Sequence, residues 1–475
     1  MHRVLFLLLL ALPLASSAQP TLTPVSGTPG PDAYREAAER IIAAATVDST
    51  AWMRLAYLCD TFGHRLSGSQ ALEDAIDWML ATMEADGLEN VEGQPVMVPK
   101  WVRGEESAAL VAPRYEALPM LGLGGSVATP PEGITADVLV VRSFEELERR
   151  ATEATGKIVV FNAPFTSYGE TVRYRGAGAS AAARAGAVAS LIRSVGSFSM
   201  QTPHTGSMRY DEGVRQIPHA ALTSEATEML QRMQDRGVTP RITLRMESHF
   251  EGEAPSRNVI GEIRGRESPE EVVVIGGHID SWDVGQGAVD DAGGVVAAWE
   301  AVRLLHSLGL RPRRTVRFVA WTNEENGLRG ALAYRAALDS VALRQHVLAV
   351  ESDGGAFEPV GFGFAGSDEA FARLEAVVEP LVLPILSPSP AAETGVSRGG
   401  GGADIGPLMR EGVPGMSLNT DAVRYFWYHH TPADTVDKLT REGVQRCAAA
   451  LAIMAYVVAE MPERLPFGGQ PPGGH

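Results

Sequence analysis

The amino-acid sequence predicts an α/β fold in which a mixed sheet is sandwiched by helices and a second domain is inserted. From residue 258 onward, apolar strand-like runs alternate with helical patterns, which is typical of a sheet covered by helices. The segment 121–251 has strand and helix signals of its own. The chain has 475 residues, of which 45% are hydrophobic, and this is enough for two domains that each bury a core.

Residues 1–18 have the pattern of a secretory signal peptide. Arg3 precedes an apolar run over 4–14, and small residues suited to cleavage follow at Ser16, Ser17 and Ala18. Because the apolar run is short for a membrane span, we expect cleavage near Ala18, with an uncleaved anchor as the alternative. The mature protein is therefore expected to be secreted or periplasmic, with no membrane attachment.

The first part of the main domain is expected over 19–120. It opens with a Pro-, Thr- and Gly-rich leader and continues with helical patterns over 32–45, 49–60 and 70–86. Ser69 is the expected N-cap of the third helix. A strand is predicted over 91–98.

The inserted domain, over 121–251, opens with Gly122, Gly124 and Gly125. Short apolar runs predict strands over 138–141, 157–161 and 188–192. Helical patterns are found over 181–187 and 224–236. No set of His and acidic residues of the metal-binding kind stands out within it.

The rest of the main domain, over 252–467, repeats strand and helix. Apolar residues spaced three and four apart predict a helix face at Val295, Trp299, Val302 and Leu305. A Gly- and Pro-rich tail over 468–475 is expected to be disordered. Buried strands are predicted over 272–275, 315–321, 347–350 and 414–418, and a long helix over 442–460.

Charge and cysteine content exclude some partners and sites. The net charge is −17 and no run of Lys and Arg offsets it, which argues against nucleic acid as a partner. Cys59 and Cys447 lie far apart and have no partners at zinc-finger spacing. Export would permit a disulfide, but two buried free thiols are the favoured interpretation.

Candidate metal ligands follow the predicted strands of the main domain. In open α/β sheets, ligands bind outside the carboxyl ends of the strands, so residues far apart in sequence can converge on one crevice. The candidates are His278, Glu324 with Glu325, Asp353 and His430, which come after the strands over 272–275, 315–321, 347–350 and 414–418, respectively.

This set of residue types suits zinc chemistry. With Asp290, which follows His278 after a short loop, the set offers two His and three acids, enough for two adjacent zinc ions that share one ligand. One further acid remains for proton transfer. Asp280 is placed to accept the second ring N–H of His278 and so to fix its tautomer. No Walker loop competes with this interpretation.

Several neighbouring residues have more than one interpretation. His429 could bind in place of His430. Asp434 either supports a ligand or caps a helix, and Glu351 is interpreted as structural. Asp404 could contact substrate, but a helix cap is favoured. The Gly-rich segment 399–402 is either a loop that lets the main chain approach the site or a simple linker.

With these residues, the chain resembles the co-catalytic zinc aminopeptidases and their carboxypeptidase relatives. The resemblance covers nearly the whole mature chain and is not confined to the candidate site. Outside the site it is carried by Arg65-Leu-Ser-Gly-Ser69, Arg103-Gly-Glu-Glu-Ser107, Gly122-Leu-Gly124, Thr129-Pro-Pro-Glu-Gly-Ile-Thr-Ala136, Pro203-His-Thr-Gly206, Gly309-Leu-Arg-Pro312 and Tyr456-Val-Val-Ala459.

The resemblance implies a role for each candidate. His278 and Asp353 would bind one zinc ion, Glu325 and His430 would bind the other, and Asp290 would bridge the two. Glu324 would act as general base and acid, and the peptide bond between Asp290 and Asp291 would be cis. The fold would be the zinc exopeptidase, phosphorylase/hydrolase-like type, with a protease-associated domain as the insertion and a homodimer as the assembly.

The sequence therefore predicts a secreted metallo-exopeptidase that holds two Zn²⁺ per chain and hydrolyses dipeptides or short peptides. A strict aminopeptidase of the same family is one alternative. A non-catalytic receptor or scaffold is the alternative from a different class.

Overall fold

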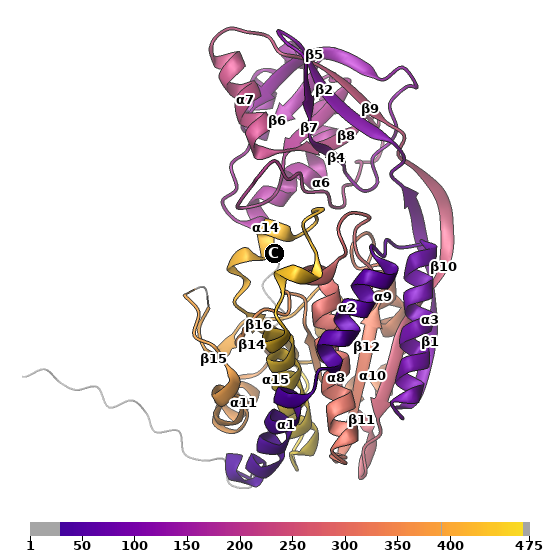
Figure 1. Ribbon diagram of the computed structural model, residues 1–475, viewed down its shortest axis with the longest axis vertical. Coiled ribbons are helices and arrows are strands. Elements are labelled where there is room, and N and C mark those ends of the chain that lie inside the picture. Colours follow the sequence, from indigo (N-terminus) through magenta and orange to yellow (C-terminus); the bar gives the residue numbers. More distant parts are fainter. Residues whose placement is uncertain (1–28, 391, 469–475) are drawn as a thin grey trace, which may run out of the picture.

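Two eight-stranded mixed sheets organise the chain into two stacked units (Figure 1). The computed structural model describes residues 29–390 and 392–468. The second unit comprises residues 106–246, which include every strand of the second sheet, and the first unit comprises the described residues on either side. The expected signal peptide and residues 469–475 of the expected tail lie outside the described residues.

The sheet of the first unit is parallel at its centre and antiparallel at both flanks. Strands β12, β11, β13 and β16 run parallel, whereas β10 pairs antiparallel with β1 and β12, and β14 pairs antiparallel with β16. In spatial order the strands are β1 (Glu89–Val102), β10 (His249–Ile263), β12 (Arg314–Trp321), β11 (Ser268–His278), β13 (His346–Glu351), β16 (Gly415–Thr420), β14 (Pro359–Ala365) and β15 (Gly395–Arg398).

Helices cover both faces of this sheet because its central strands are apolar on both sides. Val273 and Ile275 of β11 enter the larger core, whereas Val272 and Val274 enter a smaller core on the opposite face. The larger core is built with α1 (Arg35–Val47), α2 (Thr50–Phe62), α3 (Gln70–Ala85), α8 (Gly293–Ser307), α11 (Asp368–Val377), α12 (Glu379–Val382) and α15 (Arg441–Glu460), and the smaller one with α9 (Arg329–Ala336), α10 (Ser340–Gln345) and α13 (Gly406–Met409).

Helix α15 is the central helix of the larger core. By length and composition it is the single described helix that could cross a membrane, but 83% of its apolar stretch is buried inside the protein. Cys447 on this helix and Cys59 on α2 are buried free thiols, which confirms the favoured interpretation of the cysteines.

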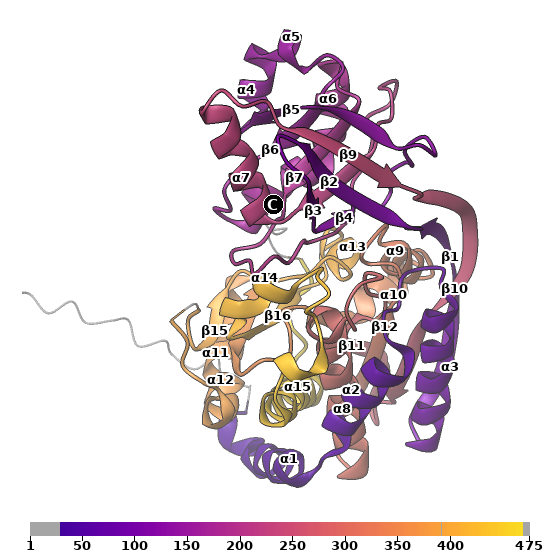
Figure 2. The ribbon, with the colours of Figure 1, turned by 45° about the horizontal axis from the view of Figure 1, so that its top comes forward.

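The second unit is joined to the first through the long ribbon of β1 and β10 (Figure 2). Strands β2 and β3 precede residue 121, where the sequence suggests a boundary, but they pair into the second sheet through β9. In spatial order, the strands of the second sheet are β3 (Glu116–Leu118), β2 (Glu106–Ala112), β9 (Arg241–Met246), β5 (Ile134–Val141), β6 (Ile158–Phe161), β7 (Ala189–Arg193), β8 (His219–Leu222) and β4 (Met120–Gly122). The helices of the second unit are α4 (Phe144–Arg149), α5 (Ala151–Ala154), α6 (Tyr168–Arg184) and α7 (Ser224–Asp235).

The expected elements correspond to observed ones, with one instructive difference. The Ser69 hydroxyl accepts the N–H of Leu72 at 3.2 Å, which confirms the predicted N-cap of α3. The helix predicted over 181–187 is the end of α6, which begins at Tyr168. Glycines in the first part of α6, including Gly176, have low helix propensity and conceal it in the sequence.

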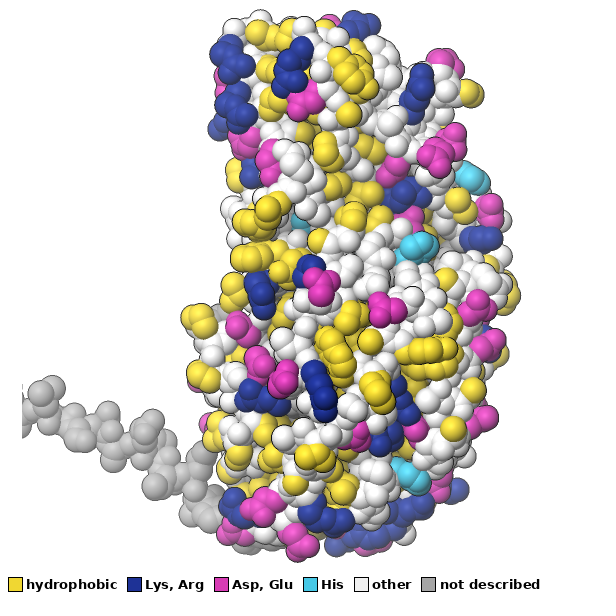
Figure 3. Space-filling model, viewed as in Figure 1, with side chains coloured by type: hydrophobic (Ala, Val, Ile, Leu, Met, Phe, Trp, Pro, Cys, Tyr) yellow, Lys and Arg dark blue, Asp and Glu magenta, His cyan; other side chains and the backbone are white. Residues whose placement is uncertain are grey.

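Acidic and basic side chains are mixed on the face of the molecule shown in Figure 3.

Candidate active site

Three parallel strands of the first sheet deliver candidate ligands to one edge. His278 is the last residue of β11, and Asp353 follows the end of β13 by two residues. Glu324 and Glu325 lie in the turn after β12. Because these strands are parallel, their carboxyl ends meet at the same edge, as the sequence predicts.

The candidate ligand atoms form two groups that share Asp290. On one side, Nε2 of His278 lies 3.1 Å from Oδ1 of Asp290 and 3.5 Å from Oδ1 of Asp353. On the other side, Nε2 of His430 lies 3.1 Å from Oδ2 of Asp290 and 2.9 Å from Oε2 of Glu325. The two oxygens of one carboxylate thus face two different imidazoles, which is the arrangement of a bridging ligand.

Asp290 is held by main-chain geometry and by Asp434. The Asp290–Asp291 peptide bond is cis, as the resemblance implies. The Asp434 carboxylate accepts the N–H groups of Ala288 and Val289 at 2.9 and 2.6 Å and the N–H of Asp290 at 3.2 Å. Asp434 therefore supports the loop that carries the bridging candidate, and the helix-cap alternative does not apply.

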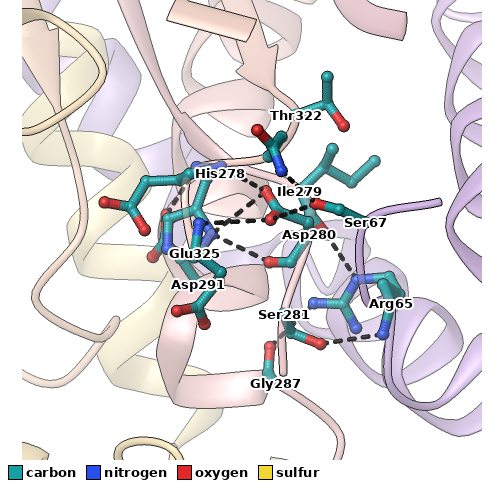
Figure 4. Close-up of polar contacts among 12 residues, drawn as sticks. Arg65, Ser67, His278, Ile279, Asp280, Ser281, Gly287, Asp291, Thr322 and Glu325 are labelled. Atoms are coloured by element: carbon teal, nitrogen blue, oxygen red, sulfur yellow. Dashed lines mark hydrogen bonds and ion pairs between the residues drawn. The ribbon is translucent and has the colours of Figure 1, made fainter. Parts of the chain in front are cut away.

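Asp280 contacts His278 in a different way from that expected. The Nδ1 of His278 faces the main-chain carbonyl of Asp280 at 2.9 Å, whereas the nearest carboxylate oxygen is 3.8 Å away. The carboxylate instead accepts the N–H groups of Glu324 and Glu325, at 3.0 and 3.4 Å, and the hydroxyl of Ser67 at 3.1 Å. One residue thus fixes the imidazole through its carbonyl and the acidic turn through its side chain (Figure 4).

Arg65 is a supporting residue that sequence reasoning placed only within a motif. Its fully buried guanidinium donates to the carbonyls of Ile279, Gln286 and Gly287 at 2.8, 2.8 and 3.0 Å, and also to that of Gly63 (Figure 4). These bonds cross-link both ends of the loop between His278 and Asp290. An arginine next to an acidic site suggests an ion pair, so its carbonyl partners could not be predicted from the sequence.

Unsatisfied buried carboxylate oxygens indicate that this site fits cations. Asp290 Oδ2, Asp353 Oδ1 and Glu325 Oε1 are buried and accept no hydrogen bond from the described residues. No described Lys or Arg forms an ion pair with them. An excess of buried carboxylates of this kind, next to two imidazoles, suits divalent metal ions such as zinc.

The titration behaviour of the acids reflects their crowding. Burial, reinforced by the carboxylates of Asp353 and Glu325 and partly offset by His278, raises the pKa of Glu324 well above its usual range. Burial alone would also raise the pKa of Asp290, but contacts with His278 and His430 hold it well below its usual range. Asp290 is therefore the anionic centre of the group, and Glu324 is a carboxyl that takes up a proton readily.

His430 differs from His278 because it lies in a loop after α14 (Tyr425–Tyr428) and is contacted by the second unit. Its Nδ1 lies 3.3 Å from the carbonyl oxygen of Thr205 and 3.3 Å from Nη1 of Arg175. His429 stacks on it with ring centroids 3.5 Å apart, and its Nε2 is 3.6 Å from Asp290. Of the two imidazoles, His430 is therefore the nearer to the candidate bridging residue.

A cavity of about 550 Å³ opens onto these ligands, and both units line it. The first unit contributes the acids, His430 and Tyr425, and the second unit contributes Arg175 and Arg209. A second cavity, of about 480 Å³, shares Asp353 with it and is lined by Gly401 and Gly402. The Gly-rich segment 399–402 is therefore a loop whose main chain approaches the site, as one of the two sequence interpretations holds.

Two further acids lie beside the site. Glu351 accepts the N–H of Ile405 at 2.9 Å, which agrees with its structural interpretation. The helix cap favoured for Asp404 is wrong, because α13 has no side-chain cap and both Asp404 oxygens lack a partner among the described residues. Burial and the nearby Glu351 raise the pKa of Asp404 well above its usual range.

Comparison with known proteins places this site in a family. The sequence profile described as Peptidase family M28 matches residues 258–455. Carboxypeptidase Q from Homo sapiens is 49% identical over 413 residues, which are 87% of this chain and 86% of the relative. The chain belongs to peptidase family M28.

Solved structures share this fold. A peptidase M28 precursor from Shewanella amazonensis SB2B superposes with a TM-score of 0.87 at 34% identity and covers 92% of this chain and 100% of that chain. An aminopeptidase from Aneurinibacillus sp. strain AM-1 reaches a TM-score of 0.64 at 20% identity and covers 91% of this chain and 98% of that chain. This second likeness shows that the fold is the same.

M28 membership, together with the clusters of His and acidic residues that could hold a metal ion, confirms the prediction of a metallo-exopeptidase. It favours the enzyme over the non-catalytic receptor. The matched segment contains all five candidate ligands and Glu324, whereas the second unit lies outside it.

Proposed function

We propose that this M28 enzyme is a secreted dipeptidase of the carboxypeptidase type that acts on substrates with a free carboxyl terminus. The observation that carries the proposal is the charge distribution in the 550 Å³ cavity. Candidate metal ligands and Glu324 line one side, and the two lining residues with permanent positive charge, Arg175 and Arg209, come from the second unit. A short peptide whose scissile carbonyl meets the ligands can therefore place its carboxylate near these arginines.

The residues would divide the work as follows. His278 and Asp353 would hold one zinc ion, Glu325 and His430 the other, and Asp290 both. Two zinc ions held there would polarise the scissile carbonyl and acidify a water molecule. Glu324, whose pKa is raised, would accept the proton of the attacking water and deliver it to the leaving nitrogen. The Asp280 carboxylate would keep Glu324 in place by accepting the main-chain N–H of Glu324.

Both arginines are available for an anionic ligand. Among the described residues, Arg209 is exposed and has no hydrogen-bond or ion-pair partner for its guanidinium. Arg175 is buried and bonds neutral oxygen acceptors, Tyr168 Oη at 2.8 Å and the Thr205 carbonyl at 3.5 Å, while its Nε has no partner. A carboxylate would supply the charge-assisted hydrogen bonds that these groups lack.

The test compares one dipeptide with a free carboxyl terminus and the same dipeptide with an amidated terminus. Arg209→Gln should raise KM for the free dipeptide by roughly tenfold or more, because a charge-assisted hydrogen bond is lost, and should leave the amidated one unchanged. Arg184→Gln is the matched control, since Arg184 is an exposed arginine of the same unit that pairs with Asp211. Equal cleavage of both substrates by the wild-type enzyme would instead favour the strict aminopeptidase.

The proposal extends to domain organisation, assembly and location. We place the peptidase domain at 19–105 plus 247–467 and assign the second unit, residues 106–246, as a protease-associated domain, since its sheet and helices form separate apolar cores. Residues 1–18 would be removed on export, and two chains would form a homodimer. Sequencing of the mature amino terminus and light scattering of the purified protein test these two points.

A further inference from the structure

One loop of the second unit lies directly against His430. This loop, Pro203–Gly206, is here called the clasp loop. The N–H of its Thr205 donates to the carbonyl of His430 at 3.0 Å, and the Thr205 carbonyl faces Nδ1 of the same residue at 3.3 Å. We propose that the clasp loop, with Thr205 as its anchoring side chain, positions His430 for metal binding. This inference rests on the proposed role of His430 as a ligand.

The first argument concerns the tautomer of His430. Its Nε2 faces Asp290 and Glu325, so this nitrogen needs a free lone pair to bind a metal ion, and Nδ1 has to carry the hydrogen. The Thr205 carbonyl can accept that hydrogen. The other described neighbour of Nδ1, Nη1 of Arg175, is a donor and would favour the opposite tautomer. The clasp loop therefore selects the tautomer that can bind a metal.

The second argument concerns the main chain of His430. Its φ is 62°, in the left-handed region that residues other than Gly adopt rarely. Such a conformation persists where surrounding contacts hold it. The bond from the Thr205 N–H to the His430 carbonyl is one of these contacts, and Nδ1 of His204 lies 2.8 Å from the carbonyl of His429. Two successive carbonyls of the ligand loop are thus held by the second unit.

The clasp loop is itself anchored through the Thr205 hydroxyl. This fully buried group donates to the carbonyl of Gly122 at 2.7 Å and accepts from Nη2 of Arg103 at 3.2 Å. Arg103 also donates from Nε to the carboxylate of Asp283 at 2.8 Å, and Asp283 belongs to the loop between His278 and Asp290. One hydroxyl therefore ties the clasp loop both to the rest of the second unit, at Gly122, and to the first unit, at Arg103.

Gly206 shows how closely the clasp loop fits. Its φ is 133°, and a Cβ at this position would lie 2.3 Å from the guanidinium of Arg175. The Pro203-His-Thr-Gly206 motif, which had no assigned role in the sequence, thus has a physical one. The second unit does more than cover the cavity, because it completes the surroundings of a metal ligand.

The test measures zinc binding by the full chain, without relying on activity. Thr205→Val keeps the side-chain shape but removes the hydroxyl, whereas Thr205→Ser keeps the hydroxyl. Zn²⁺ affinity and stoichiometry are measured in competition with a chromogenic chelator, and the melting temperature is recorded in parallel. Thr205→Val should lower the affinity for one of the two zinc ions by about tenfold or more, which is the usual effect of mutating a residue that supports a metal ligand. Thr205→Ser should bind both ions like the wild type.

Thr227→Val is the matched control, because Thr227 is an equally buried residue of the second unit whose hydroxyl donates within its own helix. It should leave both zinc affinities unchanged. The inference is wrong if the Thr205→Val variant binds both ions with wild-type affinity. It is also wrong if the variant loses affinity for both ions equally and its melting temperature falls as well. His430→Ala separates this from the proposed function: if that variant retains two zinc ions, the assignment of His430 as a ligand fails.

Discussion

The two histidines of the site are alike in chemistry but are held in different ways. His278 ends a central strand, its N–H donates to Asp291 at 3.2 Å, and its Nδ1 partner is a carbonyl two residues away. His430 lies in a loop with a left-handed main chain, and the partners of its Nδ1 belong to the second unit. One half of the site is therefore built by the fold of a single unit, and the other half needs both units docked together.

This difference predicts different responses to perturbation. The His278 half shares its supports with the sheet, so damage to it should appear as a loss of folding stability. The His430 half depends on a contact between units, so damage to it should lower metal affinity while the sheet remains intact. Glu324 lies between the halves, and its loss should affect neither.

The largest effect is therefore expected for Glu324→Gln. If Glu324 transfers the proton as proposed, its loss should lower kcat by between about 100-fold and 10,000-fold, while zinc content stays at the wild-type level. Activity is measured with a free dipeptide and zinc by elemental analysis of the same sample. A variant that retains most of its activity would show that another group transfers the proton. A variant that loses zinc would show that Glu324 belongs to one of the two halves.

Arg65→Met tests the His278 half. The substitution leaves three carbonyls of the His278–Asp290 loop, two buried and one partly buried, without their donors, which should lower the free energy of unfolding by about 3 kcal/mol. Denaturant unfolding is followed with zinc and after zinc removal, and the loss should persist in both states. Arg264→Met, an exposed control, should change stability by less than about 0.5 kcal/mol. If Arg65→Met lowers zinc affinity but leaves the stability of the zinc-free protein unchanged, the His278 half behaves as the His430 half is expected to, and the two halves do not differ.

Stepwise metal removal measures the difference directly in the wild type. If the chain binds two zinc ions as proposed, chelator titration should release them in two steps, because His430 is the less firmly supported of the two imidazoles. Affinities that differ by about tenfold would agree with the usual effect of residues that support a ligand. The His430→Ala variant identifies the steps, since it should keep the ion that leaves last. If it keeps the ion that leaves first, the order of the two halves is reversed.

The same difference explains how much of the site could be predicted from sequence. The His278 half follows from local rules, because β11, β12 and β13 are apolar runs and each is followed by a polar candidate ligand. The alternation of strands and helices predicts the first sheet in the same way. These signals depend on residues close together in the chain, so periodicity and motif spacing were sufficient.

The surroundings of His430 could not be predicted in this way. Thr205 lies 225 positions before His430, and it contributes a carbonyl oxygen, which any residue type could supply. Arg65 presents the same difficulty, since a guanidinium that binds only carbonyls has no recognisable partner in sequence. Strand β10 could not be predicted either, because its exposed first half contains Glu251, Gly252, Glu253 and Pro255, which disfavour a strand, and depends on pairing with β1.

The smallest expected effect is a shift of the pH profile in Asp280→Asn. The negative charge of Asp280 contributes to the raised pKa of Glu324, after burial and the carboxylates of Asp353 and Glu325. Removing that charge should lower the pKa of Glu324. Because the proposed mechanism needs the deprotonated Glu324 carboxylate, the acid limb of the kcat profile should move to lower pH, even if kcat itself falls. Asp137→Asn, at an exposed position of the second unit, should leave the limb in place. A limb that moves to higher pH would mean that Asp280 acts on Glu324 through its hydrogen bond to the main chain and not through its charge.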